Sequence, residues 1–351
     1  MRRNTLAKGW TFYPRSLKIW PKSFSSKKGM HLADPLKTAM PAPASPVSRR
    51  FLAFVFLIAG LMAAFSIPLY SLAKHAAHSD LHSHILLIPF VSIYLIYIHW
   101  KQLPQRYVSS PSWALLAAAI GFTTAGAAWG LRVSGNPISS NDYLALMAFA
   151  FVCFVTAGGF LLLGREWMRA AAFPIAFLIF IVPLPDPAAD FLENTSKFAS
   201  AEVANFLFIA TGTPVLRDGT VFQLPGIAVE VAKECSGIRS SWVLFITSLL
   251  ASYLFLRSPW RRASLVAAVI PLGLLRNGVR ILTISLLCVH LGPQMINSVI
   301  HRRGGPFFFA ASLIPLFLFL WWLRRGEVAQ RGRKTNLDAE AKPVSANAPV
   351  C

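Results

Sequence analysis

Repeated apolar runs of about 20 residues restrict the fold of this chain most, because a run of that length matches the hydrocarbon core of a bilayer. Eight such runs follow one another from Phe51 onward: Phe51–Leu72, His84–Trp100, Trp113–Leu131, Tyr143–Leu163, Ala170–Leu184, Ser236–Leu256, Ala263–Leu287 and Pro306–Leu323. Charged residues make up only 14% of the chain, whereas soluble domains contain about 25%. The sequence therefore predicts an all-α polytopic membrane protein with about eight transmembrane helices.

The positions of the basic residues predict how these helices are oriented. Eleven of the 34 Lys and Arg residues fall within the first 50 positions, and the loops after the second, fourth and sixth runs carry more. This placement follows the positive-inside rule and puts both termini in the cytoplasm. It also explains the net charge of +20 without nucleic-acid binding. We expect residues 1–50 and 324–351 to be disordered cytoplasmic tails and residues 51–323 to form the transmembrane domain.

A long polar segment, residues 185–235, separates the fifth and sixth runs and lies outside in this topology. From Asp186 to Ile209, phenylalanines spaced among acidic residues predict a helix at the membrane interface. Turn dipeptides and an apolar alternation follow, at Asp218-Gly219, at Pro225-Gly226, and at Ile227, Val229 and Val231. They predict two hairpin turns and a final strand. We therefore expect a small extracytoplasmic helix and a β-meander that lead into Cys235.

Cys235 lies where this polar segment meets the sixth apolar run, beside Ser236 and Gly237. The positive end of a helix lowers the pKa of a thiol, and Arg239 adds positive charge one turn along the same face. Both effects favour the reactive thiolate, so Cys235 is a candidate nucleophile. The competing interpretation is a small residue packed at the start of a helix. The other cysteines, Cys153, Cys288 and Cys351, form no Cys-x-x-Cys pair and no metal-ligand spacing.

Two arginines, Arg276 and Arg280, interrupt the seventh apolar run four residues apart and therefore on one helix face. An arginine at the bilayer centre costs ~2.5 kcal/mol or more, so both are candidates for function. The alternative is snorkelling to an interface, which is open to Arg276 toward the inner end of the helix. Pro271, Gly273 and Gly278 are expected to break this helix and admit water.

Histidines supply the remaining candidates for acid–base chemistry. His301 lies in the last outside loop, on the same predicted side as Cys235, and a cysteine with a histidine is the minimal arrangement for thiol acyl transfer. His290 competes with it for this role. His82 and His84 form a His-x-His pair, but no cluster of carboxylates or cysteines accompanies them as a zinc site requires. We expect no metal and no cofactor.

Six motifs together resemble those of the exosortase/archaeosortase family of membrane-embedded cysteine transpeptidases, from about Ser79 to Leu323. They are Ser79-Asp-Leu-His-Ser-His84, Phe173 to Pro185, the pre-cysteine loop Gly212-Thr-Pro to Leu224-Pro-Gly226, Cys235-Ser-Gly-Ile-Arg239, Asn277-Gly-Val-Arg280 and His301-x-x-x-Gly305. The chain departs from the pattern at two positions. Glu234 stands where the family often has a small residue, and the motifs do not demand Arg276.

The resemblance implies a catalytic site of Cys235, Arg280 and His301, supported by Arg239, Asn277, Ser236, Gly237 and His84. It implies exported substrates with a C-terminal, PEP-CTERM-like signal of short motif, hydrophobic helix and basic tail. The enzyme would form a thioester with them and pass them to a surface or membrane acceptor. It also implies a multi-pass protein of the bacterial cytoplasmic (inner) membrane, in contact with the lipid bilayer, whose site faces the extracytoplasmic side.

The sequence leaves two other functions open, and the depth of Arg280 in the membrane is a difficulty for the catalytic role. The same residues suit a membrane cysteine protease that hydrolyses its substrate. Arg276 and Arg280 also suit a transporter or lipid-linked glycan carrier that binds an anionic headgroup. Arg280 lies about ten residues before His290, hence ~15 Å below a helix end placed there. For Arg280 to contact the reacting atoms, the span must therefore be short or the outer leaflet must be thinned.

Overall fold

The computed structural model describes residues 46–79, 81–104, 107–135, 138–231, 237–292, 294–295 and 304–340, all within one compact unit that begins at Ser45. Within these ranges, five helices are long and apolar enough to cross a membrane, or seven spans if each of two bent helix pairs counts as one. The chain is thus a helical polytopic membrane protein. The eight spans that the sequence predicts are not all reproduced.

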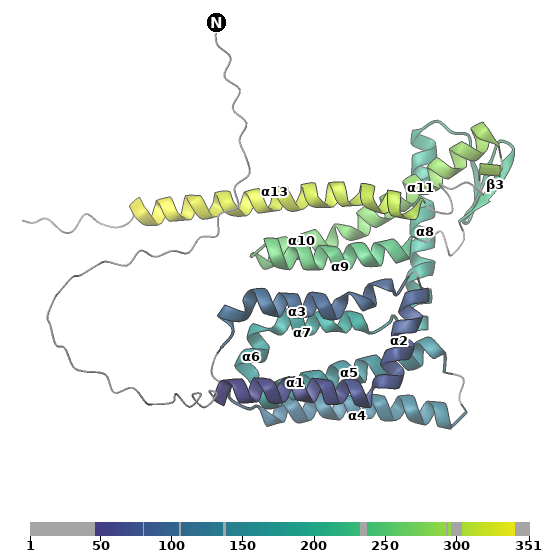
Figure 1. Cartoon of the computed structure of the whole chain (residues 1–351). Coiled ribbons are helices and arrows are strands. Elements are labelled where there is room, and N and C mark those ends of the chain that lie inside the picture. Colours follow the sequence, from purple (N-terminus) through teal and green to yellow (C-terminus); the bar gives the residue numbers. More distant parts are fainter. Residues whose placement is uncertain are drawn as a thin grey trace, which may run out of the picture. The chain divides into compact units, whose positions relative to one another are not determined.

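Most helices run side by side, and α8 crosses their direction (Figure 1). The helices are α1 (Pro46–Ala64), α2 (Ser66–His78), α3 (Ile88–His99), α4 (Pro111–Val133), α5 (Ser140–Leu162), α6 (Arg165–Ala170), α7 (Ala172–Phe177), α8 (Asp186–Ala210), α9 (Ile238–Phe255), α10 (Pro259–Ala267), α11 (Val269–Leu291) and α13 (Gly305–Glu340). Short 3₁₀ turns are η1 (Ser83–Leu86), η2 (Trp100–Gln102) and η3 (Leu178–Ile181). The strands are β1 (Leu216–Asp218), β2 (Val221–Leu224) and β3 (Ile227–Glu230).

Prolines divide two of the predicted spans into two helices each and separate a third span from the short helix that precedes it. Proline has no N–H to donate to the carbonyl four residues earlier, and its ring clashes with that carbonyl. Accordingly α1, α6 and α10 end at Ala64, Ala170 and Ala267, four residues before Pro68, Pro174 and Pro271. The break between α1 and α2 bends the first predicted span by 76°.

The second and eighth predicted spans also differ from expectation. His84–Trp100 contains α3, of only 12 residues, with a 3₁₀ turn at each end. The last span continues as α13 to Glu340, into the segment expected to be a disordered tail. Contacts with the end of α9 and the start of α10 involve the part of this extension up to Gln330. Glu327 accepts hydrogen bonds from the backbone N–H groups of Arg257 and Ser258 at 3.2 and 3.0 Å, and Gln330 accepts one from Arg261 at 2.7 Å.

A right-angled corner places α8 across the bundle. The helical segment of α7 and η3 meets α8 at 89°, and Pro183 and Pro185 occupy the connection. The start of α5 fixes this corner with polar side chains. Asn141 Nδ2 donates to the Leu184 carbonyl at 2.8 Å and to Asp186 at 2.7 Å, and Asp142 accepts the Asp186 N–H at 2.8 Å.

The three strands form an antiparallel sheet in the order β1-β2-β3 that rests on α8. Leu216 pairs with Gln223, and Leu224 with Ile227, so the turns fall at Gly219 and at Pro225-Gly226, where the sequence places them. One face of the sheet joins a buried cluster with α8 and α11, made of Ala201, Ala204, Phe208, Phe222, Leu224, Val231 and Ile281. Arg217 also binds both carboxylate oxygens of Glu202 on α8, at 2.8 and 2.7 Å.

Candidate functional site

The crossing of α8 and α11 determines where Arg280 lies along the bundle. A Cβ on Gly278 would lie 2.7 Å from Val203 Cγ1 of α8, so only glycine permits the two helices to approach this closely. Beyond this point, Ile281 packs among residues of α8 and the sheet, and Figure 1 shows α11 running past α8 toward the sheet. Arg280, half-buried, therefore lies beside the crossing. α11 thus continues beyond its crossing with α8 to Leu291, and Arg280 lies nearer to the crossing than to the helix end.

The start of α9 packs directly against α11. Gly237, the N-cap of α9, has a φ of +71°, in the left-handed region where glycine is favoured. A Cβ on Gly237 would lie 2.9 Å from both Cγ and Oδ1 of Asn277, which is only 2% exposed. One turn earlier on α11, a Cβ on Gly273 would lie 2.7 Å from Ser241 Oγ. The expectation that Gly273 and Gly278 break the helix is wrong, because α11 is continuous through both, and they let neighbouring helices approach instead.

Arg276 reaches from α11 to the same start of α9. Its side chain is 8% exposed, and its Nη2 donates to the Gly237 carbonyl at 2.9 Å and to Ser241 Oγ at 3.0 Å. The side chain thus extends toward the predicted outer end of α9. These contacts disfavour the alternative in which Arg276 snorkels toward the inner end, because the Gly237 carbonyl gives the guanidinium a partner at the start of α9.

The structure brings together part of the predicted site. Gly237 and Asn277 are in contact, and Arg280 follows Asn277 by three residues on α11. Arg239 lies exposed in the first turn of α9. Cys235, Ser236 and His301 lie outside the described residues, as does Glu234. The described geometry therefore concerns the framework around the proposed nucleophile and not the nucleophile itself. His290, the competing histidine, is exposed in the last turn of α11.

A histidine cluster surrounds the connection between α2 and η1. His82 is 6% exposed, and its Nδ1 lies 3.0 Å from Ser79 Oγ and 3.3 Å from His75 Nε2. Burial, and then the proximity of His75 and His84, lower the pKa of His82 to about 4. His84 itself is half-buried in η1. His82 is thus a neutral, hydrogen-bonded residue at neutral pH.

The sequence offered only weak signals for two of these arrangements. The spacing of Gly273 and Arg276 places a small residue one turn from the arginine, which is typical of a close helix contact, but it does not identify Ser241 or the Gly237 carbonyl as the partner. The pairing of His75 with His82 spans seven residues and a helix end. No periodic pattern predicts it.

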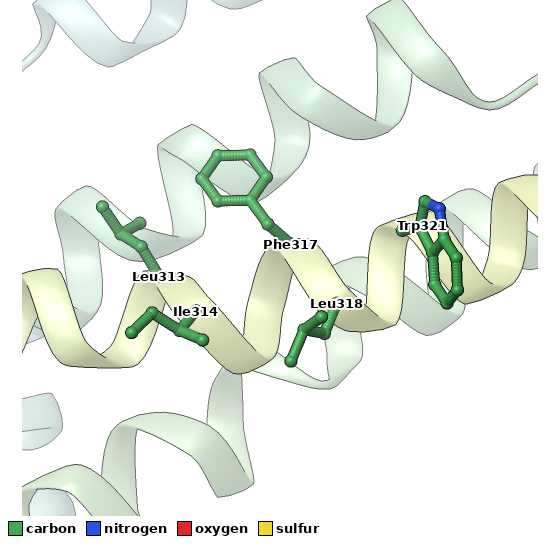
Figure 2. A pocket seen from close by; sticks show the side chains of 5 residues that line it. All are labelled: Leu313, Ile314, Phe317, Leu318 and Trp321. Atoms are coloured by element: carbon green, nitrogen blue, oxygen red, sulfur yellow. The ribbon is translucent and has the colours of Figure 1, made fainter. Parts of the chain in front are cut away.

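An apolar hollow of about 520 Å³ on α13 is a separate feature. Figure 2 shows that its lining side chains all come from α13; they are Leu313, Ile314, Phe317, Leu318 and Trp321. Most of these side chains are exposed by half or more of their surface, for example Ile314 at 63% and Leu318 at 59%. Such a face is typical of a helix that contacts lipid tails. It holds no group for covalent chemistry.

A family model described as transmembrane exosortase matches residues 76–318. This range includes the Cys235 motif, the Asn277–Arg280 motif and His301. No curated protein and no solved structure matches the chain. Because the matched range covers well over half of the sequence and nearly all of its membrane helices, the chain belongs to the transmembrane exosortase family.

Proposed function

We propose that this exosortase is a cysteine transpeptidase that cleaves the C-terminal sorting signal of exported proteins and transfers them to a surface or membrane acceptor. The contact between Gly237 and Asn277 carries the proposal. It joins the start of α9, two residues after Cys235, to the Asn277–Arg280 turn of α11. The two sequence motifs that the resemblance pairs as nucleophile and arginine are therefore neighbours in space.

The proposed reaction proceeds in two acyl-transfer steps. The Cys235 thiolate attacks the scissile carbonyl carbon, and Arg280 stabilises the oxyanion that forms. Collapse of this intermediate restores the carbonyl as a thioester and breaks the C–N bond, while His301 gives its proton to the leaving amine. An acceptor amine then attacks the thioester and loses its proton to His301. The thiolate departs and Cys235 is regenerated.

The location of Arg280 supports this role. If α8 lies at the outer membrane surface, the crossing at Gly278 marks that level on α11, and Arg280 is at the interface where a substrate's cleavage motif would arrive. The hydrophobic helix of the signal would then lie among the spans, with its basic tail in the cytoplasm. We infer a bacterial inner-membrane location with both termini inside, a PEP-CTERM-like signal as substrate and the lipid bilayer as surroundings.

Substitution of the proposed catalytic residues tests the activity. We expect Cys235→Ala and Arg280→Ala each to abolish processing of a co-expressed substrate that carries a C-terminal sorting signal, measured as the mass shift on an immunoblot. Cys288→Ala, which removes a buried cysteine elsewhere on α11, is the control and should leave processing intact. Normal processing by Cys235→Ala would refute the nucleophile assignment and leave the carrier interpretation.

Detection of the intermediate distinguishes transfer from hydrolysis. We expect mass spectrometry of the enzyme, quenched in acid after exposure to a substrate peptide, to find the acyl group on Cys235 and hydroxylamine to release it. A product that carries an added amine acceptor indicates transfer. A product with only a free carboxylate in the presence of acceptor amines indicates a hydrolytic protease.

A further inference from the structure

The Gly237 carbonyl is held by three donors at the start of α9. Arg276 Nη2 lies 2.9 Å from this oxygen, the Ser241 N–H nitrogen 3.0 Å and Ser240 Oγ 3.2 Å. A carbonyl oxygen has two lone pairs, so these donors fill its capacity. The Ser241 bond is the first of the helix itself. Arg276 is the donor that comes from another helix, and it therefore fixes the start of α9 relative to α11.

No carboxylate of the described residues neutralises the positive charge of Arg276. In the part of the chain that the structure describes, no carboxylate lies within 4.0 Å of its guanidinium; the ion pairs there are Lys197–Glu230 and Arg217–Glu202. Its Nη1 is buried and has no hydrogen-bond partner among the described residues. A buried cation is costly unless it is paired, and a neutral glutamine has donors enough for one carbonyl and one hydroxyl. The contacts with Gly237 and Ser241 therefore do not by themselves explain why the residue is charged.

The length of the chain limits how far Cys235 can lie from Gly237. Two residues of chain span at most ~7.6 Å between Cα atoms, which bounds the separation of Cys235 from Gly237. Electrostatic interactions over this range stay appreciable wherever water screens them little. A cation beside the first turn of α9 adds to the positive end of the helix, and both stabilise a thiolate relative to a thiol.

We propose that Arg276 is a positioning residue of the exosortase site, which fixes the cysteine-bearing segment through the Gly237 carbonyl and favours the Cys235 thiolate through its charge. The inference rests on the proposed function, because it requires Cys235 to be the nucleophile. It assigns different tasks to the two arginines of α11. Arg280 acts on the reacting carbonyl, and Arg276 acts on the nucleophile through the backbone.

The alkylation rate of Cys235 as a function of pH tests the inference without any substrate. The full-length protein, purified in detergent with Cys153, Cys288 and Cys351 replaced by alanine, has Cys235 as its sole thiol. Its reaction with iodoacetamide follows the thiolate population, so the pH midpoint reports the thiol pKa. We expect Arg276→Met to raise this midpoint by a unit or more, which slows alkylation about tenfold at a pH well below the unsubstituted midpoint. Arg276→Lys, which keeps the charge, should stay near the unsubstituted midpoint.

Arg262→Met is the matched control because Arg262 makes the equivalent contact at the opposite end of α9. Its Nε donates to the Leu256 carbonyl at 2.8 Å, far along the helix from Gly237. We expect this variant to keep the midpoint of the unsubstituted protein. A midpoint that moves equally in the Arg262 and Arg276 variants, or in neither, overturns the inference.

Processing kinetics separate geometry from charge. Lysine presents one compact ammonium and cannot reproduce the guanidinium fork, so Arg276→Lys should lower kcat several-fold with little change in KM while the alkylation midpoint holds. An unchanged kcat in Arg276→Lys overturns the positional part. If Arg276→Met does not give folded, monodisperse protein, Arg276→Gln removes the charge while keeping a donor. A Gln variant with an unshifted midpoint overturns the electrostatic part.

Failure of the proposed function looks different from failure of the inference. If Cys235 of the unsubstituted protein titrates near the ordinary value of about 8.5 and Cys235→Ala still processes substrate, the enzymatic proposal fails and takes the role of Arg276 with it. If the unsubstituted midpoint is low and Arg276→Met leaves it low, only the inference about Arg276 fails.

Discussion

At Gly237, the backbone and the packing impose the same requirement. Its φ of +71° disfavours any side chain, and the space that a Cβ needs is occupied by Asn277. A left-handed non-glycine residue costs about 1–2 kcal/mol. We expect Gly237→Ala to pay this strain and also to displace Asn277, so that processing of a sorting-signal substrate falls at least tenfold while the protein stays folded.

Gly212→Ala is the control that tests the effect of backbone strain without a contact to Asn277. Gly212 has a φ of +67°, but a Cβ there would meet nothing within 4 Å. We expect this variant to lose a similar amount of thermal stability and to keep its processing rate. Equal loss of processing in both variants would mean that the contact with Asn277 is irrelevant to activity.

Because of the lowered pKa of His82, we predict that the stability of the folded protein falls as the pH is lowered. Its pKa in the folded protein is about 4, below the ordinary 6.5, so the unfolded chain binds its proton more readily. The free energy of unfolding is therefore fully retained above pH 6.5, falls as the pH drops, and levels off below about pH 4. The expected loss at pH 5 is roughly 2 kcal/mol. The measurement is the midpoint of thermal unfolding in detergent at pH 7.5 and pH 5.

Replacement of the histidine tests this assignment. We expect His82→Gln to reduce the difference between pH 7.5 and pH 5, because the variant has no buried imidazole to protonate. The neighbours that set the pKa stay in place, namely His75 and His84, which disfavour the proton, and Asp186, which favours it. His290→Gln removes an exposed histidine and should leave the pH dependence unchanged. An identical pH dependence in His82→Gln would assign the effect to other groups.

Some individual residues were predictable from the sequence and others were not. The pattern Asn277-Gly-Val-Arg280 and a glycine after the cysteine predict residues of a site by type and spacing, and the structure brings Gly237 and Asn277 together. The direction of the Arg276 side chain was not predictable. It depends on a carbonyl 39 residues away on another helix. Helical periodicity shows only on which face of its own helix a residue lies.

At the scale of the elements, the apolar runs predict where helices lie but not where they break. The breaks before Pro68, Pro174 and Pro271 follow a local rule that the sequence contains. That rule does not say whether a break bends a span. The α1–α2 pair bends by 76°, whereas α10 and α11 together form one long candidate membrane span. Pro315 even lies inside α13. Packing against neighbouring helices decides the outcome.

We predict that α8 lies at the membrane surface, and a spin label on this helix can test its depth. Its outward side exposes aromatic and aliphatic residues, among them Phe191 at 69%, Phe198 at 58% and Phe206 at 69%. Exposed apolar side chains on a helix at right angles to the spans are typical of burial in the headgroup region. We expect a spin label at Phe198→Cys, in liposomes and without the native cysteines, to be more accessible to oxygen than to a water-soluble nickel complex.

A label on the sheet gives the comparison. Gln223 is exposed on β2, whose neighbours Phe222 and Leu224 face the buried cluster. We expect the label at Gln223→Cys to be more accessible to the nickel complex. If both labels favour the nickel complex, α8 lies in water and does not mark the membrane surface. The level assigned to Arg280 would then lose its support.

For the whole molecule, the sequence predicted the class but not the internal organisation. Composition and run length suffice for a helical membrane protein. They do not show that α11 ends beside a sheet or that α8 crosses it, because both depend on contacts between segments far apart in the chain, such as Val203 with Gly278. The positions of Cys235 and His301, which the motifs predict to meet, lie outside the described residues.

The orientation of the whole molecule is the last prediction, and α9 provides the geometry for it. This helix has 18 residues and is therefore about 27 Å long, close to the thickness of the hydrocarbon core. Arg257, Arg261 and Arg262 follow its C-terminal end, whereas α8 and α11 contact its start. The positive-inside rule places the arginine end in the cytoplasm and the sheet on the other side.

Single cysteines on the two sides test this arrangement. Asp218 on β1 and Lys101 in η2 are both exposed, and each becomes the sole cysteine when the four native ones are replaced by serine. We expect a membrane-impermeant maleimide to label Asp218→Cys in intact spheroplasts and Lys101→Cys only after permeabilisation. The reverse pattern would place the sheet, the start of α9 and the proposed site in the cytoplasm. An enzyme for exported proteins would then be excluded, because its substrates would reach the opposite face.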